Sequence, residues 1–205
     1  MTTNDFLARI TRDMTHEGEN THQAETHYQR FCIAVIGMNG VGKSHFGKNL
    51  ASKLRMKRID TDTEFRKIYG KEQEYIDAHG CEAFRKMEEE IVCRSLLPNH
   101  IVVLSGGAIE SAVIRAALQK RAIVLWIQAG HKRTHKNLKR ANVERPEFKH
   151  GVSTGAVKTL LNLRNPLYEE TADIALLPHI RFAEQVSVAI RLLRGFITDK
   201  QPHRL

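Results

Sequence analysis

The chain has 205 residues, of which 41% are hydrophobic, so it is long and apolar enough to form one domain with a sizeable core. No apolar run approaches the length of a transmembrane helix, and the N-terminus lacks the apolar segment of a signal peptide, so we expect a cytoplasmic protein with no membrane partner. The formal net charge of +9 is compatible with a polyanion partner, and its meaning depends on where the basic residues lie.

The first 30 residues differ in character from the rest of the chain. Phe6, Leu7 and Ile10 form a short apolar face, and a polar, charged linker follows through Arg30. We expect residues 1–30 to form a mobile appendage, residues 31–197 to form the domain, and residues 198–205 to form a tail.

A phosphate-binding loop opens the domain. An apolar strand at 31–36 leads into residues 37–44, which fit the pattern G-x-x-x-x-G-K-[ST], and a helix is expected over 43–54. Glycine lets backbone N–H groups converge on a phosphate, and the helix N-terminus faces the anion. Lys43 would place its ammonium near the β- and γ-phosphates, and the Ser44 hydroxyl would ligate Mg²⁺. The predicted nucleotide contacts are Gly37, Asn39, Gly40, Val41, Gly42, Lys43, Ser44, His45 and, further along the chain, Arg140.

Two aspartates follow the next expected strand, at 56–60. If this strand extends through Asp60 and Asp62, both carboxylates share one face. Close to Lys43 and Ser44, one carboxylate could then hold Mg²⁺ through water while the other contacts an acceptor hydroxyl. The alternative is that Asp62 caps the N-terminus of a following helix.

The remaining pattern alternates helices and strands. Helices are expected over 82–97, 110–120, 154–162 and 182–197, and strands over 101–104, 122–127 and 173–177. This alternation predicts an α/β, three-layer P-loop kinase fold, in which helices flank a central five-stranded parallel sheet. Ligands bind beyond the carboxyl ends of such strands, so the segments starting at Gly37, Asp60 and Ser105 should meet in one crevice.

Much of the positive charge lies between residues 131 and 152. The segment is typical of a mobile lid that covers ATP, and it could also be a patch for a polyanion. It has no interleaved aromatic residues, which argues against base stacking, so we expect a lid and no nucleic-acid partner.

Residues 31–177 resemble the shikimate kinase family through motifs that occur in a fixed order. The phosphate loop alone is shared by many kinases, and the ordered set is much more specific. The motifs lie at 37–44, 59–62, 83–88, 106–108, 145–146 and 164–170.

The resemblance implies transfer of the ATP γ-phosphoryl group, with Mg²⁺, to the 3-hydroxyl of shikimate. We expect the chain to be a monomer. Lys43, Asp62 and Arg145 would be catalytic, and Arg145 would move with the lid. Ser44 and Asp60 would serve the metal ion. The acceptor site would comprise Asp62, Arg85, Gly106, Gly107 and Arg164, with the two arginines holding the carboxylate and Glu88 orienting Arg85.

Some residues depart from the family pattern and leave other interpretations open. Ser105 stands in or near the place of the first of three glycines, Glu147 and Phe148 replace the commoner leucines, and His45 stands where threonine is frequent. Each arginine, taken singly, could also be a surface group, and Arg164 could be a cation at a helix C-terminus. The alternatives are a kinase for another small carboxylated polyol and a non-catalytic nucleotide-binding regulator.

Overall fold

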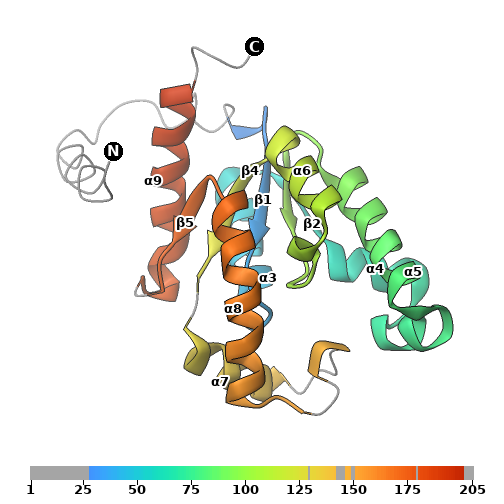
Figure 1. The fold of residues 1–205 in the computed structure, drawn as a ribbon. Coiled ribbons are helices and arrows are strands. Elements are labelled where there is room, and N and C mark those ends of the chain that lie inside the picture. The colour runs from blue at the N-terminus through green and yellow to red at the C-terminus, as the bar shows by residue number, and fades with distance from the viewer. Residues whose placement is uncertain (1–27, 129, 142–145, 149–150, 179, 201–205) are drawn as a thin grey trace.

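The computed structural model describes residues 28–128, 130–141, 146–148, 151–178 and 180–200 (Figure 1). The apolar face expected at Phe6, Leu7 and Ile10 and the lid residue Arg145 lie outside these ranges. Among the described residues, no helix combines the length and the apolar character that a membrane span needs.

Five parallel strands form the centre of the domain in the spatial order β2-β3-β1-β4-β5. Their bounds are Cys32–Ile36 (β1), Lys57–Asp60 (β2), His100–Val103 (β3), Ile123–Ile127 (β4) and Ile174–Leu176 (β5). The three central strands read as continuous apolar runs because both of their faces are covered. The predicted five-stranded parallel sheet is therefore confirmed.

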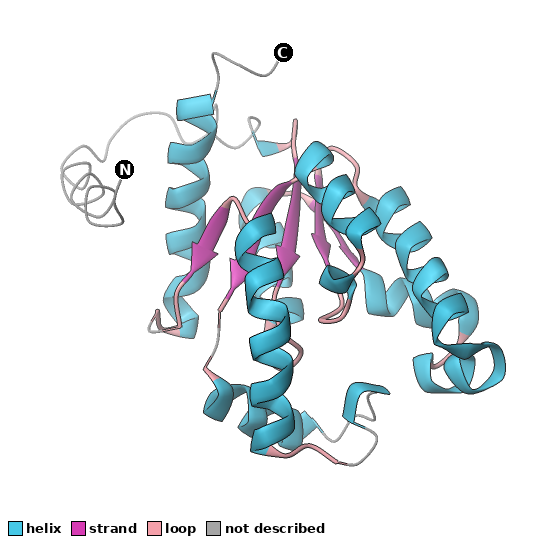
Figure 2. Cartoon of the chain, in the orientation of Figure 1, coloured by secondary structure: helices cyan, strands magenta, loops and turns pink. Residues whose placement is uncertain are grey.

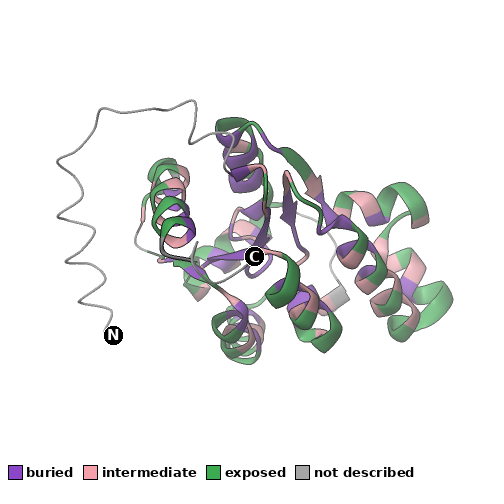
Figure 3. Cartoon of the chain, turned by 90° about the horizontal axis from the view of Figure 1, so that it is seen from above, coloured by how far each residue is buried: buried purple, intermediate pink, exposed green. Residues whose placement is uncertain are grey.

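Helices cover both faces of the sheet (Figure 2). Their bounds are Lys43–Leu54 (α3), Thr61–Tyr69 (α4), Glu72–Ser95 (α5), Ala112–Arg121 (α6), His131–Ala141 (α7), Thr154–Thr171 (α8) and Phe182–Lys200 (α9), with short 3₁₀ helices at Ala108–Glu110 (η2) and Pro146–Phe148 (η3). One apolar cluster joins the sheet to α3 and α9, and a second joins its other face to α5, α6 and the end of α8. Figure 3 shows the buried strands enclosed by helices whose outer surfaces are exposed.

Two helical segments follow β2, and the sequence indicated only the first of them, as the alternative in which Asp62 caps a helix. Helix α4 and the first part of α5 are rich in polar residues, and α4 buries only Thr61 and Phe65. They are held by aromatic contacts, in which the Phe65 ring lies 5.4 Å from Tyr75 and 5.0 Å from Phe84. Because Tyr75 and Phe84 are 10 and 19 residues from Phe65 in the chain, the spacing of apolar residues does not indicate these contacts.

Helix α8 is longer than predicted. The expected helix ended at 162, before Pro166, whereas the observed one continues through that proline to Thr171. Arg164 and Tyr168, one turn apart, are both buried on the side facing the domain. Their burial keeps the chain helical despite the hydrogen bond that proline cannot donate. Arg164 is therefore not a cation at a helix C-terminus.

Candidate active site

The phosphate loop connects β1 to α3 in the arrangement that the motif predicts. Gly42 precedes the first residue of α3 with φ of 100°, a left-handed conformation that glycine adopts without steric cost. No side chain caps this helix end. An anion in the loop would therefore meet backbone N–H groups and the positive end of the helix dipole.

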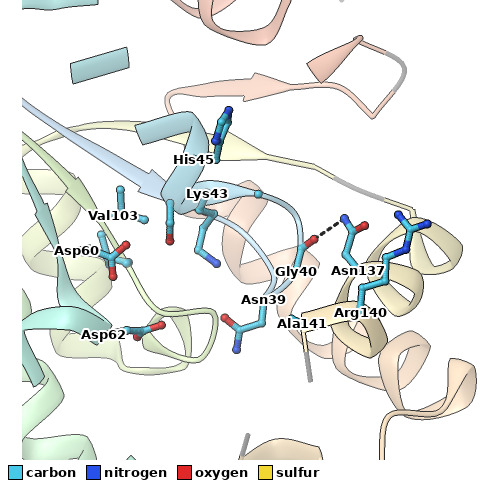
Figure 4. A pocket seen from close by; sticks show the side chains of 13 residues that line it. Asn39, Gly40, Lys43, His45, Asp60, Asp62, Val103, Asn137, Arg140 and Ala141 are labelled. Carbon is cyan, nitrogen blue, oxygen red and sulfur yellow. Dashed lines mark hydrogen bonds between the residues drawn. The ribbon is translucent and has the colours of Figure 1, made fainter. Parts of the chain in front are cut away.

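Lys43 lies folded over the loop. Its side chain is largely buried, and its Nζ donates a hydrogen bond to the Met38 carbonyl at 3.1 Å. In Figure 4 the ammonium points into a cavity between Asn39 and Asp62. This cavity has a volume of about 460 Å³ and is lined by Asn39, Gly40, Gly42, Lys43, Ser44, His45, Asp60, Asp62, Val103, Leu104, Asn137, Arg140 and Ala141.

Most of the predicted nucleotide contacts therefore line one cavity, and two do not. Val41 is buried in the core, so only its backbone could approach a phosphate. Gly37 lies against β4, where an added Cβ would come within 2.6 Å of the Ile127 carbonyl oxygen. His45 lines the cavity, but its ring points away from Lys43 and Asp62. Arg140 lines the cavity from α7, across the phosphate loop from the two aspartates (Figure 4).

The two aspartates do not share a strand face, which corrects the prediction. β2 ends at Asp60, whose Oδ1 accepts a hydrogen bond from the Thr63 N–H at 3.4 Å and so caps α4. Asp62 lies in the first turn of that helix, so the alternative with Asp62 as the cap is also wrong. Both carboxylates nevertheless line the cavity that contains Lys43 and Ser44, because the cap turns the chain at the end of the strand.

The glycine turn after β3 touches the phosphate loop. The Gly106 N–H donates to Asn39 Oδ1 at 3.1 Å, and an added Cβ at Gly106 would lie 2.7 Å from that side chain. An added Cβ at Gly107 would lie 2.8 Å from Arg85 Nη2. An added side chain at Gly106 would meet the phosphate loop and one at Gly107 would meet the Arg85 guanidinium, so the turn lies between the loop and Arg85.

Tyr168 in α8 anchors this turn through a hydrogen bond to its backbone. Its hydroxyl donates to the Gly106 carbonyl at 2.7 Å, and the ring stacks on Trp126. Burial raises the pKa of the Tyr168 phenol well above its ordinary value, so the hydroxyl remains a donor. No role was predicted for Tyr168 from the sequence, although this residue belongs to the motif at 164–170.

Arg85 is held by a buried carboxylate. Its Nη1 lies 2.6 Å from Glu88 Oε2, and Glu88 is only 5% exposed. The Ser105 hydroxyl donates to Glu88 Oε1 at 2.5 Å and accepts from the Ala108 N–H at 3.1 Å. Ser105 therefore connects the glycine turn to the carboxylate that positions Arg85, and this pair does not lie on a solvated helix face.

Arg164 faces the same region from α8 with a side chain that is only 2% exposed. Its Nε donates to Glu110 Oε1 at 2.7 Å, and its Nη1 lies 3.9 Å from Glu147 Oε1. Glu110 Oε2 also lies 3.4 Å from Arg85 Nη2, so one carboxylate joins the two arginines. Burial lowers the pKa of Arg85, but Glu88, Glu110 and Glu147 raise it by more, so the guanidinium stays charged.

The described part of the predicted lid contacts the phosphate loop. Asn137 Nδ2 in α7 donates to the Gly40 carbonyl at 2.7 Å, and Asn39 Nδ2 donates to Glu147 Oε1 at 2.5 Å. No role was predicted for Glu110 or Asn137 from the sequence, in which Glu147 stands out only as a departure from leucine. The sequence feature that could have indicated a role for Glu110 is its position as an acidic residue shortly after the glycine turn.

Comparison with known proteins adds independent information. A family model described as "Shikimate kinase" matches residues 39–193. The shikimate kinase of Mannheimia succiniciproducens is 38% identical over 151 residues, which cover 70% of this chain and 83% of that protein. The shikimate kinase of Bradyrhizobium diazoefficiens is 30% identical over 175 residues, which cover 82% of each.

Solved structures share the fold at lower identity. A shikimate kinase from Acinetobacter baumannii in complex with shikimate superposes with a TM-score of 0.77 at 23% identity, covering 86% of this chain and 98% of that one. A gluconokinase from Sinorhizobium meliloti gives a TM-score of 0.57 at 18% identity, covering 83% of this chain and 98% of that one.

Proposed function

Because the chain belongs to the shikimate kinase family, we propose that it transfers the γ-phosphoryl group of ATP to the 3-hydroxyl of shikimate. One observation carries the proposal. The phosphate loop and the arginine pair meet through Asn39, Gly106 and Gly107, so a nucleotide and a carboxylated acceptor could lie side by side.

Phosphoryl transfer depends mainly on positioning and on neutralising charge. Lys43 would offset the charge of the β- and γ-phosphates from its position over the loop. Asp62 would accept the proton of the acceptor hydroxyl as that oxygen bonds to phosphorus and the β–γ bridging bond breaks. Arg145 would add positive charge, a role that rests on the resemblance alone.

The acceptor would be held by its carboxylate. Arginine offers two parallel donors in a fixed plane, which matches a carboxylate better than lysine does. Arg85 and Arg164 already converge on one carboxylate in the folded chain, which supports their assignment to this role. Gly106 and Gly107 would let the ring of the acceptor lie against backbone.

The residues present also fit a magnesium ion. Ser44 and Asp60 provide hard oxygen ligands on the wall of the cavity that contains Lys43. When bound, Mg²⁺ would neutralise phosphate charge. A closed lid would exclude water and so protect ATP from hydrolysis.

The direct test is ATP-dependent turnover of the full chain with shikimate, quinate and gluconate as separate acceptors. Shikimate should be phosphorylated, with ADP formed in equal amount. Turnover of quinate or gluconate alone would identify a kinase for a different polyol, and ATP binding without transfer to any acceptor would indicate a regulator. The expectations of a monomer and of a cytoplasmic location remain predictions.

Replacement of Lys43 tests the role of the loop. Lys43→Ala should lower kcat at least about 100-fold, the loss typical of removing one electrostatic contact to a transition state. Lys48→Ala, an exposed lysine on the same helix, is the matched control and should behave as the unmodified chain. Circular dichroism should show that both variants are folded. Equal turnover of the two would exclude the proposed mechanism.

A further inference from the structure

Glu110 occupies the position between Arg85 and Arg164. Its Oε1 accepts from Arg164 Nε at 2.7 Å, and its Oε2 lies 3.4 Å from Arg85 Nη2. These are the two guanidinium groups to which the proposed function assigns the acceptor carboxylate. The folded chain therefore presents a carboxylate of its own to the groups that would bind the substrate.

The local charge disfavours an additional carboxylate. Two guanidinium groups face three carboxylates, those of Glu88, Glu110 and Glu147. An acceptor carboxylate would be the fourth negative group around two positive ones, and like charges at this range repel strongly where water is partly excluded. Binding should therefore require that one of the glutamates move.

Burial indicates which glutamate can move. The Glu147 side chain is 17% exposed and accepts a hydrogen bond from Asn39 in the phosphate loop. The Glu88 side chain is 6% exposed and accepts a hydrogen bond from the partly buried Ser105 hydroxyl, so its withdrawal would leave that hydroxyl without its acceptor. The Glu110 side chain is 33% exposed and lies at the end of the 3₁₀ helix η2. A rotation about its side-chain bonds would bring the carboxylate into water without uncovering the core.

The backbone of Glu110 is held independently of its carboxylate. Its N–H donates to the Gly107 carbonyl at 3.0 Å, and its own carbonyl accepts from Arg115 Nη1 at 3.0 Å. The side chain can therefore leave the arginines while the glycine turn stays in place. Arg164, only 2% exposed, is fixed by its surroundings and would remain ready for a second carboxylate.

We propose that the Glu110 carboxylate competes with the acceptor carboxylate for Arg85 and Arg164. In the free enzyme it satisfies Arg85 and Arg164, and the acceptor binds by displacing it. Glu110 thereby lowers the affinity for the acceptor and sets how strongly a carboxylated ligand is preferred over a neutral one. This inference rests on the proposed function, because it takes the acceptor to be a carboxylate.

The test is calorimetric binding of shikimate to the full chain and to Glu110→Gln and Glu110→Ala. The glutamine variant keeps the size of the side chain and removes its charge, so it separates competition from packing. Both variants should bind shikimate more tightly, with Kd lower by roughly tenfold, the scale of one charge-assisted hydrogen bond. Glu170→Gln, an exposed glutamate on α8, is the control and should leave Kd unchanged.

A second ligand distinguishes competition from general loosening of the site. The methyl ester of shikimate has no charge to compete with Glu110, so its Kd should change much less than that of shikimate in Glu110→Gln. Unchanged or weaker binding of shikimate by Glu110→Gln, with an unchanged melting temperature, would overturn the inference and make Glu110 a residue that positions the arginines. Equal tightening for shikimate and its ester would also overturn it.

Turnover separates this inference from the function on which it rests. If the unmodified chain phosphorylates shikimate and the Glu110 variants bind it no more tightly, the inference fails and the function stands. If the unmodified chain does not phosphorylate shikimate, the proposed function itself fails. The apparent KM for ATP should be the same in all variants, because Glu110 does not line the cavity next to Lys43.

Discussion

At the residue scale, Arg85 and Arg164 occupy unequal environments although the same role is proposed for both. The Arg164 side chain is 2% exposed, whereas that of Arg85 is 37% exposed and lies over the Phe84 ring. Removal of Arg164 would leave Glu110 and Glu147 near an unfilled buried space. Removal of Arg85 would uncover Glu88 but little of the core.

This asymmetry predicts different effects of two alanine substitutions. Arg85→Ala and Arg164→Ala should each raise KM for shikimate at least about tenfold, since each removes a charge-assisted contact to the carboxylate. KM for ATP should be unchanged in steady-state assays. Thermal unfolding should show a larger drop in melting temperature for Arg164→Ala than for Arg85→Ala. Arg191→Ala, an exposed arginine on α9, is the control.

An unchanged affinity for shikimate in both variants would refute the arginine pair as the carboxylate site. An equal loss of stability in both would show that the exposed fraction does not govern the cost of removing these side chains. The two measurements are independent, so one can fail while the other holds.

The residues of the phosphate loop could be predicted from sequence, whereas the environment of Arg164 could not. The loop is local: its glycines, lysine and serine occur within eight consecutive positions and act through backbone geometry that these residues determine. The position of Arg164 depends on Glu110, 54 residues away, and on a helix that continues through Pro166. No local pattern encodes that pairing.

At the scale of elements, the junction of β2 and α4 combines a structural role and a proposed chemical role in Asp60. Its carboxylate caps the helix through the Thr63 N–H and also lines the cavity proposed for Mg²⁺. The sequence left open whether the strand extends through both aspartates, because a helix with so few buried positions gives no periodic signal. Because Asp60 caps the helix, α4 begins at Thr61, and Asp62 in its first turn lines the cavity.

The two roles of Asp60 can be separated by two substitutions. Asn caps helices as well as Asp does, so Asp60→Asn should retain most of the stability, whereas Asp60→Ala should lower the free energy of unfolding by about 1 kcal/mol. Both remove the negative charge, so the Mg²⁺ concentration for half-maximal turnover should rise at least about tenfold in both. Chemical denaturation and magnesium titration of turnover measure the two effects.

Asp77→Asn, an exposed aspartate on α5, is the control and should change neither quantity. If Asp60→Asn turns over shikimate at the original magnesium concentration, the carboxylate has no role in holding the metal ion. If Asp60→Ala is as stable as Asp60→Asn, the cap contributes nothing to the stability of the domain.

At the scale of the whole molecule, the core extends beyond the first predicted strand. Tyr28 is 4% exposed and belongs to the apolar cluster between the sheet, α3 and α9. Its carbonyl accepts from the Phe31 N–H at 3.0 Å, and its hydroxyl lies 3.5 Å from the Ile190 carbonyl in α9. The sequence predicts a domain that begins at residue 31, because Tyr28 is a single aromatic residue among polar neighbours and forms no pattern.

This packing predicts that the functional domain begins at residue 28, which a pair of truncated chains can test. A chain lacking residues 1–27 should retain the melting temperature and the shikimate turnover of the full chain, because it keeps Tyr28. A chain lacking residues 1–30 loses one buried aromatic side chain, so it should lose about 3 kcal/mol of stability, or roughly 10 °C in melting temperature. Tyr28→Ala in the full chain should reproduce most of that loss, which distinguishes the effect of the side chain from the effect of shortening the chain.

Equal melting temperatures for the two truncated chains would show that Tyr28 lies outside the cooperative unit. A melting temperature of the chain lacking residues 1–27 below that of the full chain would show that residues 1–27 contribute to the stability of the fold.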